Sequence, residues 1–149
     1  MKKIISIILA SVMAFSLMAC GTTETKVEER TVTLVGEQNG ANVEYTMYGK
    51  GDQVDKIVQV MTTDVSAYEE TDLQMAIANV KLQYDSIMGV SYDSNVANGI
   101  LTETITMDFT SPSTAKAISE AGLMKIDGEG TISFAKTIEN MKTLGFTEK

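Results

Sequence analysis

The chain has 149 residues and a net charge of −8, from twenty acidic and twelve basic side chains, with no histidine and a single cysteine. The acidity argues against a nucleic-acid-binding protein, which needs a basic face to displace the counterions of phosphates. Without histidine, the commonest acid–base catalyst and metal ligand near neutral pH is missing, so the composition favours a binding or structural protein over an enzyme.

The N-terminal segment has the order of a bacterial lipoprotein signal. Two lysines come first, an apolar stretch follows over residues 4–17, and Ala19 directly precedes Cys20. A charged start, a short apolar run and a small residue before the cleavage point are typical of a secretory signal peptide, and the cysteine makes that point resemble a lipobox. We therefore expect residues 1–19 to be a signal peptide, cleaved between Ala19 and Cys20, with diacylglycerol attached to Cys20.

Two other interpretations of this segment are weaker. A membrane-spanning helix needs about 20 apolar residues, whereas residues 4–17 form a shorter run that three serines interrupt. Ordinary secretion is the second alternative, because Met18 is bulkier than the residue that usually lies two before a lipobox cysteine. The lipoprotein interpretation is therefore the stronger one. Because the two acyl chains of diacylglycerol anchor a protein stably, the expected location is the extracytoplasmic face of the cell membrane.

After the cysteine, a polar segment gives way to a folding pattern. Residues 20–29 are expected to be the lipid anchor and a tether, and residues 30–149 a single domain of ordinary size. Residues 31–35 and 43–48 are strand-like and flank Asn39-Gly40, a dipeptide that suits the positive φ angles of a tight turn. These two strands form the first predicted hairpin.

A third strand is predicted over residues 53–63, after a turn at residues 49–52. Its apolar residues are Val54, Val58 and Val60 on one side and Ile57 and Met61 on the other. Two-sided apolarity predicts a central strand that is partly covered on both faces. The turn, Gly49-Lys50-Gly51-Asp52, invites comparison with a phosphate-binding loop, but that loop needs the spacing GxxxxGK[ST] before a helix, so we interpret it as a plain hairpin turn.

A helix is predicted over residues 72–88. Thr71 and Gln74 fit a capping box at its start, apolar residues follow at helical spacing, and Gly89 is a suitable terminator.

A second hairpin follows, with strands over residues 90–96 and 100–109 around Asn98-Gly99. The longer strand alternates cleanly between apolar and polar residues. Glu103 interrupts its apolar side, and we expect this residue near the open end of the sheet.

Two helices complete the pattern. Ser111-Pro112 begins a short one, with proline where its missing N–H is harmless, and Gly122 ends it. Ser133 caps the last helix, which ends at Gly145-Phe146 in a Schellman motif. The order β-β-β-α-β-β-α-α predicts an α+β domain with a mainly antiparallel sheet of about five strands and helices on one face.

Three segments of the chain resemble a known family. They are VTLVGEQNGANVEYTMYGKGD, QYDSIMGVSYDSNVANGILTETITMDF and SFAKTIENMKTLGF. Together with the lipobox start, they resemble the YehR-like bacterial lipoproteins over essentially the whole domain from about Arg30 onward. The resemblance implies a lipid-anchored domain outside the cytoplasm and carries no catalytic signature.

Other chemistry-bearing patterns have structural explanations. Asp127-Gly128-Glu129-Gly130 could be a weak calcium-binding turn, but it lacks the EF-hand pattern. The many methionines could bind Cu(I), yet most lie at apolar positions and are better explained as core residues. The acidic pairs Glu28-Glu29 and Glu69-Glu70 are interpreted as solvated charge, and the row Thr102, Thr104 and Thr106 as exposed strand surface. Five tyrosines are spread over several elements, and the sequence leaves open whether they converge.

We therefore expect no catalytic, cofactor-binding or metal-binding residue, and Cys20 is the one predicted site of modification. The expected function is that of a membrane-anchored binding or interaction module of the cell envelope. Its expected partners are the membrane, which it reaches through diacylglycerol on Cys20, and an envelope protein, peptide or small ligand. No nucleic-acid partner is expected. The alternatives are a carboxylate-dependent envelope hydrolase and a structural or assembly lipoprotein without a small ligand.

Overall fold

The computed structural model describes residues 27–124, 126 and 131–149. The expected signal peptide, the cleavage point between Ala19 and Cys20 and nearly all of the tether lie outside the described residues, as does the predicted turn over residues 127–130. Within the described part, no helix is long and apolar enough to cross a membrane. The hydrophobic core is built from side chains between Leu34 and Phe146, so this part of the chain is a domain with its own core, of the kind that can fold independently.

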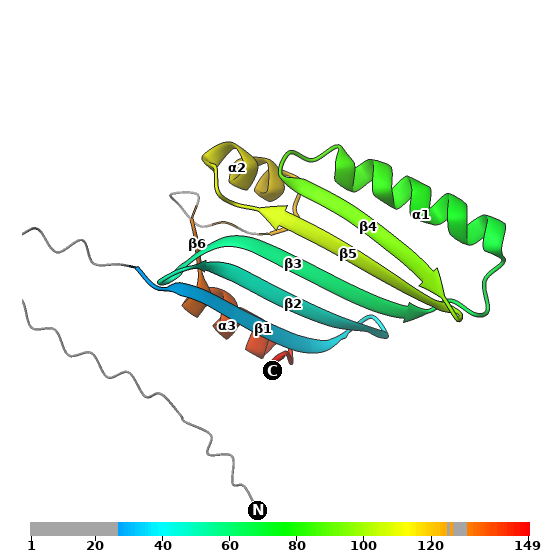
Figure 1. Cartoon of the computed structure of the whole chain (residues 1–149), viewed down its shortest axis with the longest axis horizontal. Helices are drawn as coiled ribbons and strands as arrows, with labels where there is room; N and C mark the ends of the chain where they lie inside the picture. Colours follow the sequence, from blue (N-terminus) through cyan, green and yellow to red (C-terminus); the bar gives the residue numbers. More distant parts are fainter. Residues whose placement is uncertain (1–26, 125, 127–130) are drawn as a thin grey trace, which may run out of the picture.

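Within the part of the chain that the structure describes, seven strands and three helices make an α+β fold (Figure 1). The strands are β1 Glu29–Gln38, β2 Ala41–Lys50, β3 Gln53–Asp64, β4 Val90–Ala97, β5 Ile100–Asp108, β6 Ile132–Ser133 and β7 Thr147–Glu148. The helices are α1 Glu70–Asp85, α2 Pro112–Glu120 and α3 Phe134–Thr143.

The strands form one antiparallel sheet in the order β4-β5-β3-β2-β1-β7, and β6 also pairs with β3. The fold class is as predicted, but the strand count of about five was too low. β6 and β7 were missed because each has two residues, too few to show an alternating pattern.

The two predicted hairpins are confirmed. Asn39 and Gly40 have φ angles of 54° and 80°, and Asn98 and Gly99 have 54° and 75°. Two consecutive positive φ angles are typical of the type I′ turn, whose twist matches that of the strands it joins. The Asn-Gly dipeptides therefore fix the register of β1 on β2 and of β4 on β5.

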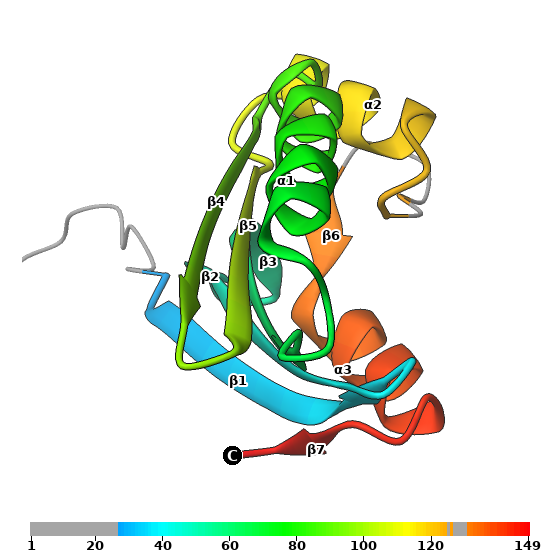
Figure 2. The same cartoon turned by 90° about the vertical axis from the view of Figure 1, so that its right-hand side faces the viewer.

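All three helices lie on one face of the curved sheet, and Figure 2 shows them within its concave side. β3 is central, as predicted, but the helices cover only one of its faces. A bulge in the pairing with β2, between Tyr48 and Gly49, places Val54 among the buried core residues. Val54 therefore does not share a side with Val58 and Val60, which are half-buried.

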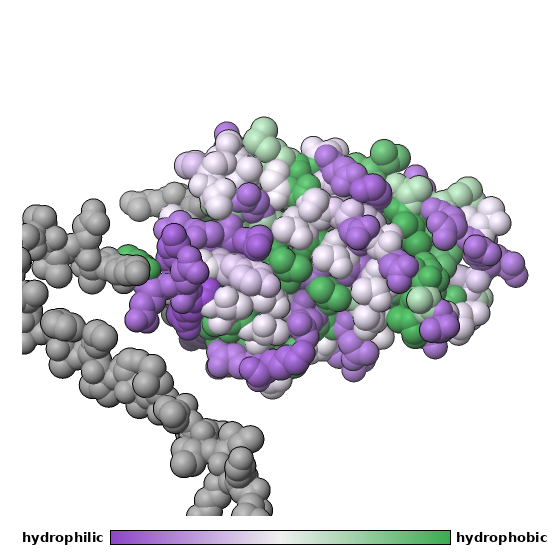
Figure 3. Space-filling view, viewed as in Figure 1, coloured by the Kyte–Doolittle hydropathy of each residue, from purple (hydrophilic) through white to green (hydrophobic). Residues whose placement is uncertain are grey.

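The helix-free face is the one seen in Figure 3. It has a weakly polar surface with small apolar patches and hydrophilic residues around them. Thr102, Thr104 and Thr106 alternate with the buried Leu101, Ile105 and Met107 on β5, so the predicted inward and outward sides of this strand are confirmed.

The ends of the helices follow the predicted signals in α2 and α3. Ser111 accepts a hydrogen bond from the Thr114 N–H, and Ser133 accepts one from the Lys136 N–H. At the end of α3, Gly145 N–H donates to the Lys142 carbonyl and Phe146 N–H to the Met141 carbonyl. These two bonds define the Schellman motif. Gly145 has the left-handed backbone conformation that this motif needs, and Phe146 is buried in the core.

The predicted capping box of α1 is wrong. The helix begins at Glu70 after Glu69, whose carbonyl accepts from the Leu73 N–H, and no side chain caps it. Thr71 therefore lies inside the first turn rather than before it. The helix also ends earlier than predicted, at Asp85, because a non-helical connection leads from there to Gly89.

Candidate functional site

A cavity of about 150 Å³ lies on the covered face of the sheet, between α1 and α3. Strands β1, β2 and β3 supply Leu34, Tyr45, Met47, Ile57 and Gln59. Ile105 and Met107 come from β5, Tyr84 from α1, and Thr137 and Met141 from α3. Leu123 and Met124, which follow α2, complete the lining. The site is therefore assembled from segments that are far apart in the sequence.

The floor of the cavity follows one row of residues across the sheet. In the strand register, Leu34 pairs with Tyr45, Tyr45 with Gln59, Gln59 with Ile105, and Ile105 with Tyr92. Paired residues in adjacent strands direct their side chains to the same face. Gln59 is thus an amide at the centre of a row that is otherwise aliphatic and aromatic.

Two tyrosines join the helix α1 to the edge strand β4. The rings of Tyr84 and Tyr92 are stacked, with centroids 5.6 Å apart and an interplanar angle of 2°. Lys81 Nζ donates to the Tyr92 carbonyl at 3.1 Å and forms an ion pair of 2.8 Å with Asp85. These contacts hold α1 in place, although none of its residues is fully buried.

Glu103 has a partner on the covered face of the sheet. Tyr92 Oη donates to Glu103 Oε1 at 2.6 Å. Burial of the ring, together with this bond to a carboxylate, raises the pKa of Tyr92 above that of a free phenol. The acidic residue that interrupts the apolar side of β5 is therefore hydrogen-bonded by an aromatic side chain of the neighbouring strand.

The polar groups that line the cavity make few internal contacts. Among the hydrogen bonds of the described residues, none involves the side chains of Tyr45, Gln59, Tyr84 or Thr137. Burial raises the pKa of Tyr45 and of Tyr84, so both phenols stay neutral well above pH 7 and can donate or accept hydrogen bonds. The rings of Tyr45 and Phe146 pack in a T-shaped arrangement, with centroids 5.5 Å apart.

Four methionines, Met47, Met107, Met124 and Met141, line the cavity. Met47 and Met107 are buried in the core, as predicted, whereas Met88 is 60% exposed. Thioether side chains are flexible and polarisable, and they adapt to ligands of different shape. The cavity wall can therefore adjust more readily than one built from branched side chains.

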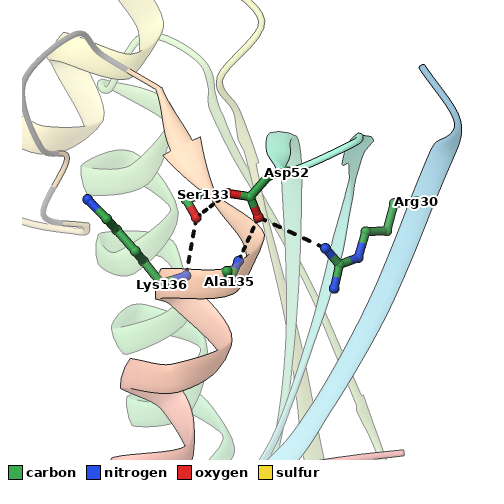
Figure 4. A network of polar contacts seen from close by, with 5 residues as sticks. All are labelled: Arg30, Asp52, Ser133, Ala135 and Lys136. Carbon is green, nitrogen blue, oxygen red and sulfur yellow. Dashed lines mark hydrogen bonds and ion pairs between the residues drawn. The ribbon is translucent and has the colours of Figure 1, made fainter. Parts of the chain in front are cut away.

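A separate polar network ties the turn between β2 and β3 to the start of α3 (Figure 4). Asp52 accepts from the Ser133 hydroxyl at 2.6 Å and from the Ala135 N–H at 2.9 Å, and Arg30 lies 4.0 Å away. The hydrogen bond from Ser133, then that from Ala135, lowers the pKa of Asp52. The turn leads into a strand, as predicted, and its carboxylate serves as a structural cap for α3.

Comparison with known proteins places this fold in a family. The family described as a protein of unknown function, DUF1307, matches residues 30–147. The chain belongs to the DUF1307 family. The matched region contains every residue that lines the cavity, so the cavity lies wholly within the family domain.

Relatives of this family agree with the predicted resemblance to YehR-like proteins. The chain is 25% identical to the uncharacterized lipoprotein YehR of Escherichia coli K12 over 152 residues, which cover 99% of this chain and 96% of the relative. The NMR structure of E. coli YehR has a TM-score of 0.65 at 22% identity and covers 83% of this chain and 93% of its own. The NMR structure of a protein from Streptococcus pneumoniae TIGR4 has a TM-score of 0.55 at 15% identity, with 97% and 99% covered.

The acidic pairs that the sequence offered as candidate catalytic groups do not line the cavity. Glu28-Glu29 and Glu69-Glu70 are exposed at the starts of β1 and α1. Within the ranges that the structure describes, no three acidic, histidine or cysteine residues gather as a metal site. Sequence analysis missed Gln59, and the signal that could have found it is a polar residue between Ile57 and Met61 on the apolar side of a strand.

Proposed function

We propose that the protein is a lipid-anchored binding module of the cell envelope, and that its ligand binds in the cavity between α1 and α3. The observation that carries the proposal is the cavity itself, an apolar hollow whose neutral polar groups make no hydrogen bonds within the described protein. Binding sites for small molecules combine apolar walls with a few polar groups that orient the ligand.

The anchor is the second part of the proposal. Cys20 follows a charged start, an apolar run and Ala19, and the family relative in E. coli is named a lipoprotein. Diacylglycerol on Cys20 would hold the processed chain at the membrane, and residues 20–29 would link it to the domain. At about 3.3 Å per residue, this tether could span roughly 30 Å when extended.

The anchor is tested by replacing Cys20. We expect Cys20→Ser to abolish labelling of the protein with radioactive palmitate and to move it out of the fraction that needs detergent for extraction. Val27→Ser, a change within the expected tether but seven residues away from Cys20, is the control and should leave labelling intact. Wild-type protein that is unlabelled and released without detergent would instead support ordinary secretion.

The cavity is tested by filling it. Met141 is half-buried and lines the cavity from α3, whereas Leu144 is 69% exposed near the end of the same helix. We expect Met141→Trp to abolish the chemical-shift changes that small neutral organic molecules produce at cavity residues of the domain 27–149, and Leu144→Trp to preserve them. A ligand at 100 times its Kd should also stabilise the wild type by about 2.7 kcal/mol.

Either of two results would contradict cavity binding. The first is a panel of neutral and charged probes that leaves the cavity resonances of the wild type unchanged. The second is binding that Met141→Trp and Leu144→Trp preserve equally, because the ligand would then bind elsewhere.

A further inference from the structure

The size of the cavity limits what can enter it. A volume of about 150 Å³ corresponds to a cavity that accommodates a benzene molecule. Part of a larger ligand could extend toward solvent, but the group that enters must be about as large as one six-membered ring or a short alkyl segment.

The lining also limits the charge of that group. None of the described residues around the cavity is acidic or basic, and the nearby Glu103 accepts its hydrogen bond from Tyr92. An ion that entered would lose its hydration without gaining a counter-ion, which is strongly unfavourable. The entering group is therefore neutral.

Gln59 adds a requirement for hydrogen bonding. It lies in the central strand, between Tyr45 on β2 and Ile105 on β5, and burying an amide beside such neighbours is unfavourable unless the amide is hydrogen-bonded. Its side chain is half-buried, faces the cavity and makes no hydrogen bond to another described residue. An amide can donate and accept at the same time, and Tyr45 and Tyr84 line the same cavity.

On the basis of the proposed function of the cavity, we propose that it selects a neutral ring or short alkyl group that carries a hydroxyl or carboxamide, and that Gln59 determines this specificity. The apolar walls bind the carbon skeleton, and Gln59 hydrogen-bonds the polar atom. A site built to hydrogen-bond a polar group discriminates against an analogue that lacks it, because its own polar group is then left without a partner.

The test uses two pairs of probes of matched shape, titrated into the domain 27–149 and followed by NMR. Phenol and toluene differ in a hydroxyl against a methyl group, and benzamide and benzoate differ in charge. We expect Gln59→Leu to lower the affinity for phenol relative to toluene by roughly tenfold. We also expect the wild type to bind benzamide at least about tenfold more tightly than benzoate.

Gln74→Leu is the matched control, because Gln74 is exposed on α1, and it should leave the phenol-to-toluene ratio unchanged. If Gln59→Leu also leaves the ratio unchanged, or if benzoate binds as well as benzamide, the specificity inference is overturned while cavity binding stands. If no probe of either pair perturbs the cavity resonances, both this inference and the proposed function are overturned.

Discussion

Replacing Phe134 by alanine is expected to lower the free energy of unfolding by about 3–5 kcal/mol, measured by urea denaturation of the domain. Phe134 is fully buried, with 0% of its surface exposed. The guanidinium of Arg30 lies 4.7 Å from the centre of the Phe134 ring. The backbone N–H of Phe134 donates to the Asp52 carbonyl at 2.7 Å. Truncation would remove the aromatic contacts and leave a cavity between α3 and the sheet.

Leu144→Ala is the control for this change. Leu144 follows α3 and is 69% exposed, so its truncation should alter the free energy of unfolding by less than about 0.5 kcal/mol. Similar losses in the two variants would show that burial at the start of α3 does not anchor this helix.

Replacing Gly89 by alanine is expected to destabilise the domain by about 2–5 kcal/mol, through two effects that add. Gly89 has a φ of +82°, where a Cβ is unfavourable. That Cβ would also lie 2.6 Å from Thr114 Cβ and 3.1 Å from the Asp108 carbonyl. The connection from α1 to β4 would then have to move away from α2. Thermal unfolding followed by circular dichroism measures the loss.

Gly40→Ala separates the two effects. Gly40 has nearly the same φ, +80°, but no atom lies within 4 Å of its added Cβ. It should therefore show the backbone strain alone, about 1–2 kcal/mol. Equal destabilisation at the two positions would mean that α2 can yield to a Cβ at Gly89, and that steric crowding contributes nothing there.

The sequence predicted the elements whose signals are local. Asn39-Gly40 and Asn98-Gly99 have the positive φ angles that their residue types favour, so both hairpins could be placed from the turn residues alone. The caps of α2 and α3 were also found, because Ser111 and Ser133 bond to N–H groups three residues away.

Features that depend on distant residues could not be predicted in the same way. β7 exists because Thr147 pairs with Val35 across more than a hundred residues. The side of Val54 depends on a bulge opposite Tyr48 and Gly49, in which Asp55 has no partner in β2, and this extra residue shifts the alternation by one position. Local propensity is overridden in both places by the geometry of the sheet.

The cavity was beyond sequence analysis for a related reason. Tyr45, Gln59 and Tyr84 belong to β2, β3 and α1, and the register of the sheet and the position of the helix decide that they meet. Sequence alone left the convergence of the tyrosines open. A polar residue on an apolar strand side, as at Gln59, is the local signal to examine in related chains.

The contact of Lys81 with β4 protects the protein against aggregation through the edge of its sheet. β4 ends the sheet, and an edge strand offers its backbone groups to any extended segment that approaches. The Lys81 ammonium donates a hydrogen bond to the carbonyl of Tyr92, the third residue of β4, and forms an ion pair with Asp85. A foreign strand would have to displace this pair before it could extend the sheet. Detachment of α1 would therefore convert a protected edge into a template for aggregation.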